Sequence, residues 1–197
     1  MKIIGITGPS GSGKTVLTEH LSELGIPTVD ADALYHSMLI PPSACLDAIR
    51  DKFGNGVFFV DGSLNRVALG EIVFNDKNKL NLLNSTVLHM VLTEIRSIIK
   101  EYDCKGINVV AVDAPTLIES GFNSECHIVI SVIAPKENRI SRIMERDNIN
   151  MDKAVQRVEA QMDDDFYIRH SDLVILNNGT RAEYEQRISD TLNKLGL

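Results

Sequence analysis

Short apolar segments alternate along this chain with segments of helical periodicity. The apolar segments are rich in Ile and Val at both odd and even positions, and they lie at 2–7, 26–30, 107–113, 127–134 and 172–176. Strands that are buried on both faces of a parallel sheet have this composition. Because helical segments separate them, the pattern predicts an α/β fold with a five-stranded parallel sheet, flanked by helices that form right-handed crossovers.

The interval between the second and third strands is too long for a simple crossover. Within 76–101, apolar residues recur three or four positions apart, which predicts one face of a long amphipathic helix: Leu80, Leu83, Val87, Val91, Ile95 and Ile98. Shorter helical pieces are predicted near 43–52 and 64–73. We therefore expect a single domain with three parts: a core at about 1–32, 105–135 and 166–197, an inserted helical lobe at about 33–104, and a polar, arginine-bearing lid at about 136–165.

The composition suits one globular domain and excludes several classes of protein. The chain has 197 residues, of which 44% are hydrophobic, enough to bury a core. Its formal net charge of −7 argues against a general nucleic-acid binder, which would carry a basic surface. No apolar run approaches the roughly 20 residues that span a bilayer, and no secretory signal pattern is visible. We therefore expect a cytoplasmic protein with no nucleic-acid, membrane or obligate protein partner.

The cysteines provide no sign of cross-linking or of a metal site. Cys45, Cys104 and Cys126 are odd in number, widely spaced and without a C-x-x-C pair. Neither a disulfide framework nor a zinc site is expected from this pattern. We expect all three to be reduced and structural.

The segment "GPSGSGKT", Gly8 to Thr15, matches the pattern G-x-x-x-x-G-K-[ST] in full. It follows a predicted strand and precedes a predicted helix, which is the context that a phosphate-binding loop requires. Gly11 and Gly13 would let backbone amides turn inward around a phosphate, and the helix N-terminus would add positive potential. Lys14 is expected to reach the β- and γ-phosphates, and the Thr15 hydroxyl to hold Mg²⁺. The alternative is a glycine-rich turn that matches by chance.

A phosphate-binding loop does not by itself name the class, because GTPases, motor ATPases and small-molecule kinases share it. A translational GTPase would need an N-K-x-D motif to read the base, and the nearest candidate, "LNNGT", lacks it. The length of the chain is that of a nucleotide or metabolite kinase.

Two carboxylates follow the second predicted strand, in "TVDADAL". Asp30 and Asp32 alternate, so in an extended chain they would point the same way. A carboxylate at this strand end can accept the proton of an attacking hydroxyl or help arrange Mg²⁺, and we select Asp32 as the candidate base. The alternative is that Asp32 caps the helix that starts with "ALYHSML".

A third carboxylate, Asp113, ends the strand "VVAVD". An acidic residue at this position can hold Mg²⁺ directly or through water. The alternative is that Asp113 caps the turn before Pro115.

Arg139, Arg142 and Arg146 lie at i, i+3 and i+7, which places three guanidinium groups on one helical face. Guanidinium groups suit phosphoryl oxygens, so this face is a candidate charge clamp on the transferred phosphoryl group. The alternative is a solvated basic face paired with Glu137 and Glu145. Further along the lid, Arg157 and Gln161 form an i, i+4 pair.

Taken in order along the chain, these segments resemble the dephospho-coenzyme A kinase family. The resemblance covers nearly the whole chain, and the phosphate-binding loop contributes least to it because many families share that loop. More specific are "DAD", "DGSLNRVALGEIVF" and "RVEAQM", followed by "DLVILNNGT". The resemblance implies a P-loop kinase fold with a helical substrate lobe and a lid. It also implies transfer of the γ-phosphoryl group of ATP to the ribose 3′-hydroxyl of dephospho-coenzyme A, the last step of coenzyme A synthesis.

The resemblance also assigns roles to residues that match the family pattern. Asp32, Lys14 and Arg142 would be catalytic, and Thr15 and Asp113 would hold Mg²⁺. The helical lobe is marked by Leu64, Arg66 and Leu69. ATP would be bound by Gly11, Ser12, Gly13, Lys14, Thr15, Val16, Arg142, Arg146 and Asn177. The acceptor would be bound by Asp32, His36, Arg66 and His89.

Some positions depart from the family pattern, in the loop, in the helical lobe and in other parts of the chain. Pro9 stands where glycine is usual, and His36 where arginine is common. "HM" at 89–90 replaces His-Pro, "APTLIESG" replaces a more apolar run, and "DDDFYIRHSD" lacks the usual lysine. None of these changes removes the loop lysine, the candidate base or the lid arginines.

Two other functions fit parts of the pattern. One is a different hydroxyl kinase, acting on shikimate, gluconate or a nucleoside. Shikimate kinases also carry D-x-D after the second strand, but they lack a helical insert this long with "DGSLNR". The other is a non-catalytic ATP sensor, which the retention of Asp32 and of three lid arginines argues against.

Overall fold

The computed structural model describes all residues of the chain, 1–197. The chain divides into two compact units, one made of residues 1–29 and 102–197 and the other of residues 30–101. We describe each unit by itself.

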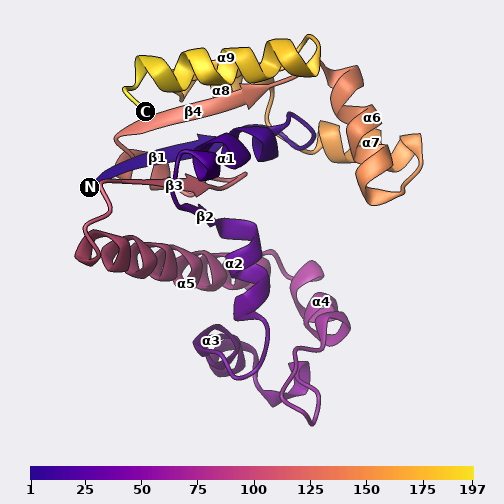
Figure 1. Cartoon of the computed structure of the whole chain (residues 1–197). Coiled ribbons are helices and arrows are strands. Elements are labelled where there is room, and N and C mark those ends of the chain that lie inside the picture. Colours follow the sequence, from indigo (N-terminus) through magenta and orange to yellow (C-terminus); the bar gives the residue numbers. More distant parts are fainter. The chain divides into compact units, whose positions relative to one another are not determined.

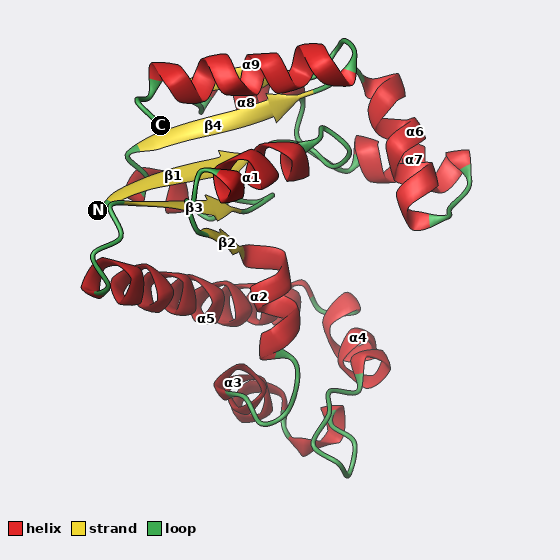
Figure 2. Cartoon of the chain, viewed as in Figure 1, coloured by secondary structure: helices red, strands yellow, loops and turns green.

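The first unit is built on a five-stranded sheet with the strand order β2-β3-β1-β4-β5. β1 pairs in parallel with β3 and β4, and β4 pairs in parallel with β5. Figures 1 and 2 show β1, β3 and β4 running the same way, with helices beside them. The strands are β1 (Lys2–Thr7), β2 (Thr28–Asp30), β3 (Val109–Asp113), β4 (Ile128–Ile133) and β5 (Leu173–Leu176).

The helices of this unit follow the strands in alternation. Two of them, α1 (Lys14–Glu23) and α9 (Arg181–Lys194), contact each other. Three more lie between β4 and β5, and a short 3₁₀ helix, η2 (Phe122–Glu125), precedes β4. The three are α6 (Lys136–Asp147), α7 (Met151–Glu159) and α8 (Asp164–Arg169).

The two faces of the sheet bury different side chains, as the period of two in a strand requires. One face carries Ile6 and Ile130, which pack with Leu17 of α1 and Ile188 of α9. The other face carries Ile133, which packs with Tyr167 of α8. Figure 1 shows α9 running alongside β4. β1 lies in the middle of the sheet and its last four residues are buried. The segment that follows β1 therefore begins at a well-anchored point of the fold.

The second unit is helical and has a core of its own. Its core residues include Leu46, Ile49, Val57 and Leu69, with Leu80 packed against them. An antiparallel bridge between Phe58 and Leu64 closes the turn between its third and fourth helical elements. The elements are α2 (Ala31–Met38), α3 (Ala44–Phe53), the 3₁₀ helix η1 (Asn55–Val57), α4 (Arg66–Phe74) and α5 (Lys77–Cys104), which continues into the first unit.

The structure confirms the predicted α/β class, the five strands and the long helix, with small changes at the ends. Four of the five strands are one to two residues shorter at one or both ends than predicted. The predicted helix at 76–101 spans 77–104, and its buried residues include Val91 and Ile95 as expected. Its last buried position is Ile99 rather than Ile98, because spacings of four from Val91 keep the stripe on one face. The bounds of the predicted lobe and lid as functional parts stay predictions.

Among the helices of the chain, none combines the length and the apolar character that crossing a membrane requires. The three cysteines are free: Cys45 is buried, Cys126 is partly buried and Cys104 is exposed. Burial raises the pKa of the Cys126 thiol to about 12, and the negative charges of Glu125 and Asp172 add to this shift. The Cys126 thiol is therefore protonated at neutral pH and packs as a small apolar side chain.

Replacement of a central strand residue tests the core of the first unit. Ile6 is fully buried in β1, so Ile6→Ala should lower the free energy of unfolding by about 3 kcal/mol through lost burial and a residual cavity. Urea denaturation followed by circular dichroism measures the change. Ile168→Ala is the matched control, because Ile168 is 45% exposed, and it should cost less than about 1 kcal/mol. Equal losses in the two variants would contradict this account of the core.

Candidate active site

The phosphate-binding loop leaves the carboxyl end of β1 and enters α1, as the sequence predicts. Gly8, Gly11 and Gly13 have φ values of 134°, 77° and 104°, which side chains rarely adopt. A Cβ atom on Gly11 would lie 2.7 Å from the carbonyl oxygen of Arg139, and one on Gly13 would lie 2.4 Å from Nδ2 of Asn177. The glycine spacing is therefore required both by the backbone conformation and by the close approach of neighbouring elements.

Side chains from outside the loop bind its carbonyl oxygens. Arg139 Nε donates to the Ser10 oxygen at 3.2 Å, and Arg142 Nη1 donates to the Gly11 oxygen at 3.1 Å. The Ser12 oxygen accepts from Arg142 Nη1 at 3.3 Å and from Asn177 Nδ2 at 2.8 Å. Arg142 Nη2 also donates to Asn177 Oδ1 at 3.2 Å, so these two side chains hold each other in place.

Two further carbonyl groups of the loop accept hydrogen bonds, one from α9 and one from the loop's own lysine. The Tyr184 hydroxyl of α9 donates to the Gly13 oxygen at 2.9 Å, and Lys14 Nζ donates to the Gly8 oxygen at 2.9 Å. Burial raises the pKa of Tyr184 well above its ordinary value, although the positive charge of Arg142 opposes the shift. The phenol therefore stays protonated and remains a donor at any physiological pH.

This arrangement determines where the amide groups of the loop point. A peptide unit is planar and trans, so its C=O and the following N–H point in opposite directions. Donors that hold the oxygens of Ser10, Ser12 and Gly13 thereby turn the N–H groups of Gly11, Gly13 and Lys14 toward the other side of the loop. Gly13 is also the N-cap of α1 and makes no side-chain cap, so the helix presents its first amides there. Such a concave group of amides at a helix N-terminus binds phosphate.

The three lid arginines differ in their surroundings. Arg139 is only 4% exposed, and its Nη1 lies 3.4 Å from Asp164 Oδ1 of α8. Burial lowers the pKa of Arg139 from its ordinary value, and the charge of Asp164 works against that shift. Arg142 is half-buried, whereas Arg146 is exposed and binds Asp147 with Nε at 2.8 Å and Nη2 at 3.0 Å. The alternative of a solvated basic face is therefore wrong for Arg139.

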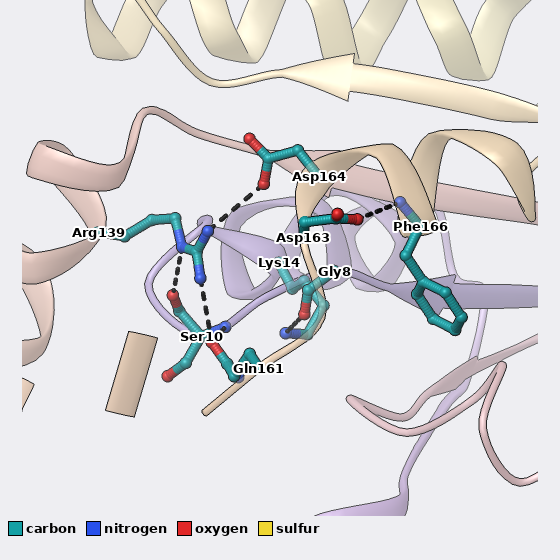
Figure 3. Close-up of polar contacts among 8 residues, drawn as sticks. All are labelled: Gly8, Ser10, Lys14, Arg139, Gln161, Asp163, Asp164 and Phe166. Carbon is teal, nitrogen blue, oxygen red and sulfur yellow. Dashed lines mark hydrogen bonds and ion pairs between the residues drawn. The ribbon is translucent and has the colours of Figure 1, made fainter. Parts of the chain in front are cut away.

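Figure 3 shows the surroundings of Arg139, with Asp164 on one side of the guanidinium group and Ser10 and Gln161 on the other. Asp163 is the N-cap of α8, and its side chain accepts from the Phe166 amide at 2.8 Å. This cap fixes the start of α8, so Asp164 occupies a defined place in the first turn of the helix.

Thr15 and Asp113 are the candidate magnesium ligands, and both lie in the first unit. Thr15 is the second residue of α1, and Asp113 ends β3 in register with Ile6 of β1, one residue before Thr7 closes that strand. A hydroxyl and a carboxylate are the hard oxygen ligands that Mg²⁺ takes beside phosphate oxygens and water, so this donor set fits the ion. The chain holds no cluster of three or more His, Cys, Asp or Glu side chains that could bind a metal without a substrate.

The predicted acceptor residues lie in the second unit, on three helices. Asp32 is in the first turn of α2, and His36 lies one turn later on the same face, with both side chains exposed. Arg66 is the first residue of α4, and His89 lies within α5, and both are exposed. These four residues and the residues of the loop are thus divided between the two units, and their predicted roles stay predictions.

Two expectations about "DAD" are wrong. β2 ends at Asp30 and α2 begins at Ala31, so Asp30 and Asp32 are not part of one extended segment. The helix cap is Asp30, whose Oδ1 accepts from the Ala33 amide at 2.9 Å, and not Asp32. Asp32 is left free of the capping role, and its carboxylate is exposed near the positive end of the helix.

Sequence reasoning did not find two of the side chains around the loop. Tyr184 recurs with Ile188 and Leu192 at spacings of four in α9, which signals only a buried helix face. Asp164 lies in an acidic run that has no periodicity. The sequence pairs Gln161 only with Arg157, whereas its Oε1 accepts from the Ser10 amide at 3.0 Å.

The sequence matches known proteins over most of its length. Residues 2–183 match the family model of dephospho-CoA kinase. The dephospho-CoA kinase of Dehalococcoides mccartyi is 38% identical over 178 residues, which are 90% of this chain and 89% of that protein. The dephospho-CoA kinase of Carboxydothermus hydrogenoformans is 35% identical over 194 residues, which are 98% of this chain and 94% of that protein.

Solved structures agree with this result. A crystal structure of a Thermus thermophilus protein has a TM-score of 0.78 at 30% identity, covering 98% of this chain and 97% of that chain. A dephospho-CoA kinase from Campylobacter jejuni has a TM-score of 0.71 at 26% identity, and the match covers 99% of this chain and 98% of that chain. A shikimate kinase from Acinetobacter baumannii, at 20% identity and a TM-score of 0.56, shares the fold. From the family match, the full-length relatives and the fold together, the chain belongs to the dephospho-CoA kinase family.

Proposed function

We propose that this chain transfers the γ-phosphoryl group of ATP to the ribose 3′-hydroxyl of dephospho-coenzyme A, the last step of coenzyme A synthesis. The observation that carries the proposal is the phosphate-binding loop whose carbonyl oxygens are held outward, in a chain that matches the dephospho-CoA kinase family over residues 2–183. Membership of a kinase family implies that ATP is the phosphoryl donor and that the acceptor is a small molecule.

The donor half of the reaction belongs to the first unit. The amides of Gly11, Gly13 and Lys14 would bind the β-phosphate, and Lys14 Nζ would exchange its bond with the Gly8 oxygen for one with the β- and γ-phosphates. Thr15 and Asp113 would hold Mg²⁺, which neutralises the charge that develops on the phosphates. The other predicted ATP contacts, Ser12, Val16, Arg142, Arg146 and Asn177, are all in this unit.

Arg142 supports the donor half of the reaction because its guanidinium group is already fixed beside the loop. It already donates to two loop carbonyl groups and to Asn177, so its guanidinium is held beside the loop. Groups that are fixed before the reaction stabilise developing charge without reorganising. We assign Arg142 and the exposed Arg146 to the phosphoryl group, and lid closure over that group would exclude water and limit ATP hydrolysis.

The acceptor half belongs to the second unit. As the 3′-oxygen forms its bond to the γ-phosphorus and the bond to ADP breaks, the hydroxyl proton passes to the Asp32 carboxylate. His36, on the same face of α2, and Arg66 and His89 are the proposed contacts with the acceptor. Their exposed side chains are accessible to a ligand. No covalent enzyme intermediate takes part.

The proposal includes a cytoplasmic location and no nucleic-acid, membrane or obligate protein partner. The use of ATP supports that location, as do three cysteines that are free rather than cross-linked. The net charge of −7 supports the absence of a nucleic-acid partner.

A substrate comparison tests the proposed reaction. Purified protein with Mg-ATP should release ADP on addition of dephospho-coenzyme A, and the product should carry the new phosphate at the ribose 3′ position. Shikimate, gluconate and adenosine should give only the background rate. Absence of ADP release above background with dephospho-coenzyme A would overturn the proposal, and turnover of one of the other acceptors would replace it.

The proposed base is tested by removing its charge at constant size. Asp32→Asn should lower turnover by roughly 10²-fold or more, because general-base catalysis is lost, whereas ATP affinity should be unchanged. Steady-state kinetics and a nucleotide titration measure the two effects. Asp51→Asn is the matched control in the same unit, since Asp51 is an exposed residue of α3. Wild-type turnover in Asp32→Asn would exclude the role of base.

The shape of the loop is tested by adding one methyl group. Gly13→Ala should weaken nucleotide binding by at least roughly tenfold, because the added Cβ atom meets Asn177 and the residue has a positive φ. Isothermal titration with Mg-ADP measures the affinity. Gly25→Ala is the control, because Gly25 also has a positive φ of 73° but no atom within 4 Å of an added Cβ. The control should lose about 1 kcal/mol of stability and no affinity. Similar affinities in both variants would contradict the proposed fit.

A further inference from the structure

The Ser10 peptide groups are held on both sides by one connected set of side chains. The Ser10 N–H donates to Gln161 Oε1 at 3.0 Å, and the Ser10 carbonyl accepts from Arg139 Nε at 3.2 Å. Arg139 Nη2 also donates to the same Gln161 oxygen, at 3.1 Å. The three hydrogen bonds form a closed ring through Ser10, Arg139 and Gln161 (Figure 3). We call this ring the Ser10 clamp.

Arg139 is the buried member of the clamp and its charge is compensated, whereas Ser10 and Gln161 are partly buried. Arg139 is 4% exposed, and its Nη1 lies 3.4 Å from Asp164 Oδ1. All the donor nitrogens of its guanidinium group therefore face protein acceptors: Nε faces Ser10, Nη1 faces Asp164 and Nη2 faces Gln161. A buried arginine with acceptors on three sides holds one orientation, because any rotation would leave a buried charge without a partner.

The backbone of Arg139 also contacts the loop. A Cβ atom on Gly11 would lie 2.7 Å from the Arg139 oxygen and 3.0 Å from its Cα. The start of α6 thus touches the loop through its main chain at Gly11 and through its side chain at Ser10. Gln161 follows α7, and Asp164 lies in the first turn of α8. The start of α6 and the segment after α7 are therefore tied to the two peptide units that flank Ser10, and α8 is tied to them through the contact of Asp164 with Arg139.

The hydrogen bond from Arg139 to the Ser10 carbonyl also determines the direction of the next amide along the chain, that of Gly11. The Ser10 carbonyl and the Gly11 N–H belong to the same planar peptide unit. When Arg139 holds that carbonyl, the Gly11 N–H has one direction only, which is toward the phosphate side of the loop. Gln161 fixes the preceding peptide unit through its N–H, so the Ser10 residue cannot rotate about its φ and ψ angles to release the Gly11 amide.

We propose that Arg139 and Gln161 are positioning residues that fix the Gly11 amide for phosphate binding and couple the order of α6, α7 and α8 to the conformation of the loop. Neither side chain needs to touch the nucleotide for this role. The inference rests on the proposed function only in that the loop binds a nucleotide, and it does not depend on which hydroxyl accepts the phosphoryl group.

Gln161→Met is the sharpest test, because it removes the acceptor oxygen at nearly constant length. Gln161 is only partly buried, so the variant should fold. Mg-ADP affinity should fall roughly tenfold, the effect of leaving buried donors without an acceptor. Gln161→Glu keeps the acceptor oxygen beside Arg139 and should stay within about threefold of wild type. Gln156→Met, at an exposed position of α7, is the matched control and should bind as wild type does.

Two further measurements separate positioning from simple packing. Amide exchange at Ser10, followed by NMR in the nucleotide-free protein, should become faster in Gln161→Met and not in Gln156→Met, because the amide loses its acceptor. In steady-state kinetics, KM for ATP should rise in Gln161→Met while KM for dephospho-coenzyme A stays unchanged. Wild-type Mg-ADP affinity in Gln161→Met, or equal losses in the Met and Glu variants, would overturn the proposal. Because Mg-ADP binding needs no acceptor, this result is independent of whether dephospho-coenzyme A is the substrate.

Discussion

The planarity of the peptide unit is the constraint on which the nucleotide site of this protein depends. A loop that binds phosphate must turn its amides inward, and a planar trans peptide then turns the preceding carbonyl groups outward. Outward carbonyl oxygens at the surface of a packed domain need donors. Here Arg139, Arg142, Asn177 and Tyr184 provide them, from α6, from the end of β5 and from α9. The rest of the first unit can be understood as the support for these donors.

Three cationic side chains of this acidic chain contact the backbone of the loop. The net charge is −7, yet Lys14, Arg139 and Arg142 all donate to the backbone of the loop. Because these cations are used to orient the loop, part of their effect on a bound phosphate acts through the backbone amides rather than through direct contact. Lys14 differs from the arginines, since its flexible side chain can exchange the Gly8 oxygen for a phosphate.

The two units of the chain correspond to the two substrates of the proposed reaction. The residues proposed for ATP all lie in the first unit, and the residues proposed for the acceptor all lie in the second. The departures of this sequence from the family pattern at His36 and Met90 fall in the second unit. Variation there can alter the contacts with the acceptor while the donor half keeps its geometry, because each unit has its own hydrophobic core.

The sequence by itself determined the five strands, the long helix and the loop, because apolar periodicity and glycine spacing are local patterns that can be recognised within a short stretch of sequence. It also identified Asp32 and the three lid arginines as candidates, but it could not say that Asp30 caps α2 or that Arg139 is buried. Only the tertiary structure decided which side chains hold the loop, since Arg139 and Tyr184 reach carbonyl groups 129 and 171 positions away in the chain. Such contacts depend on how helices pack across a sheet, and no local pattern contains that information.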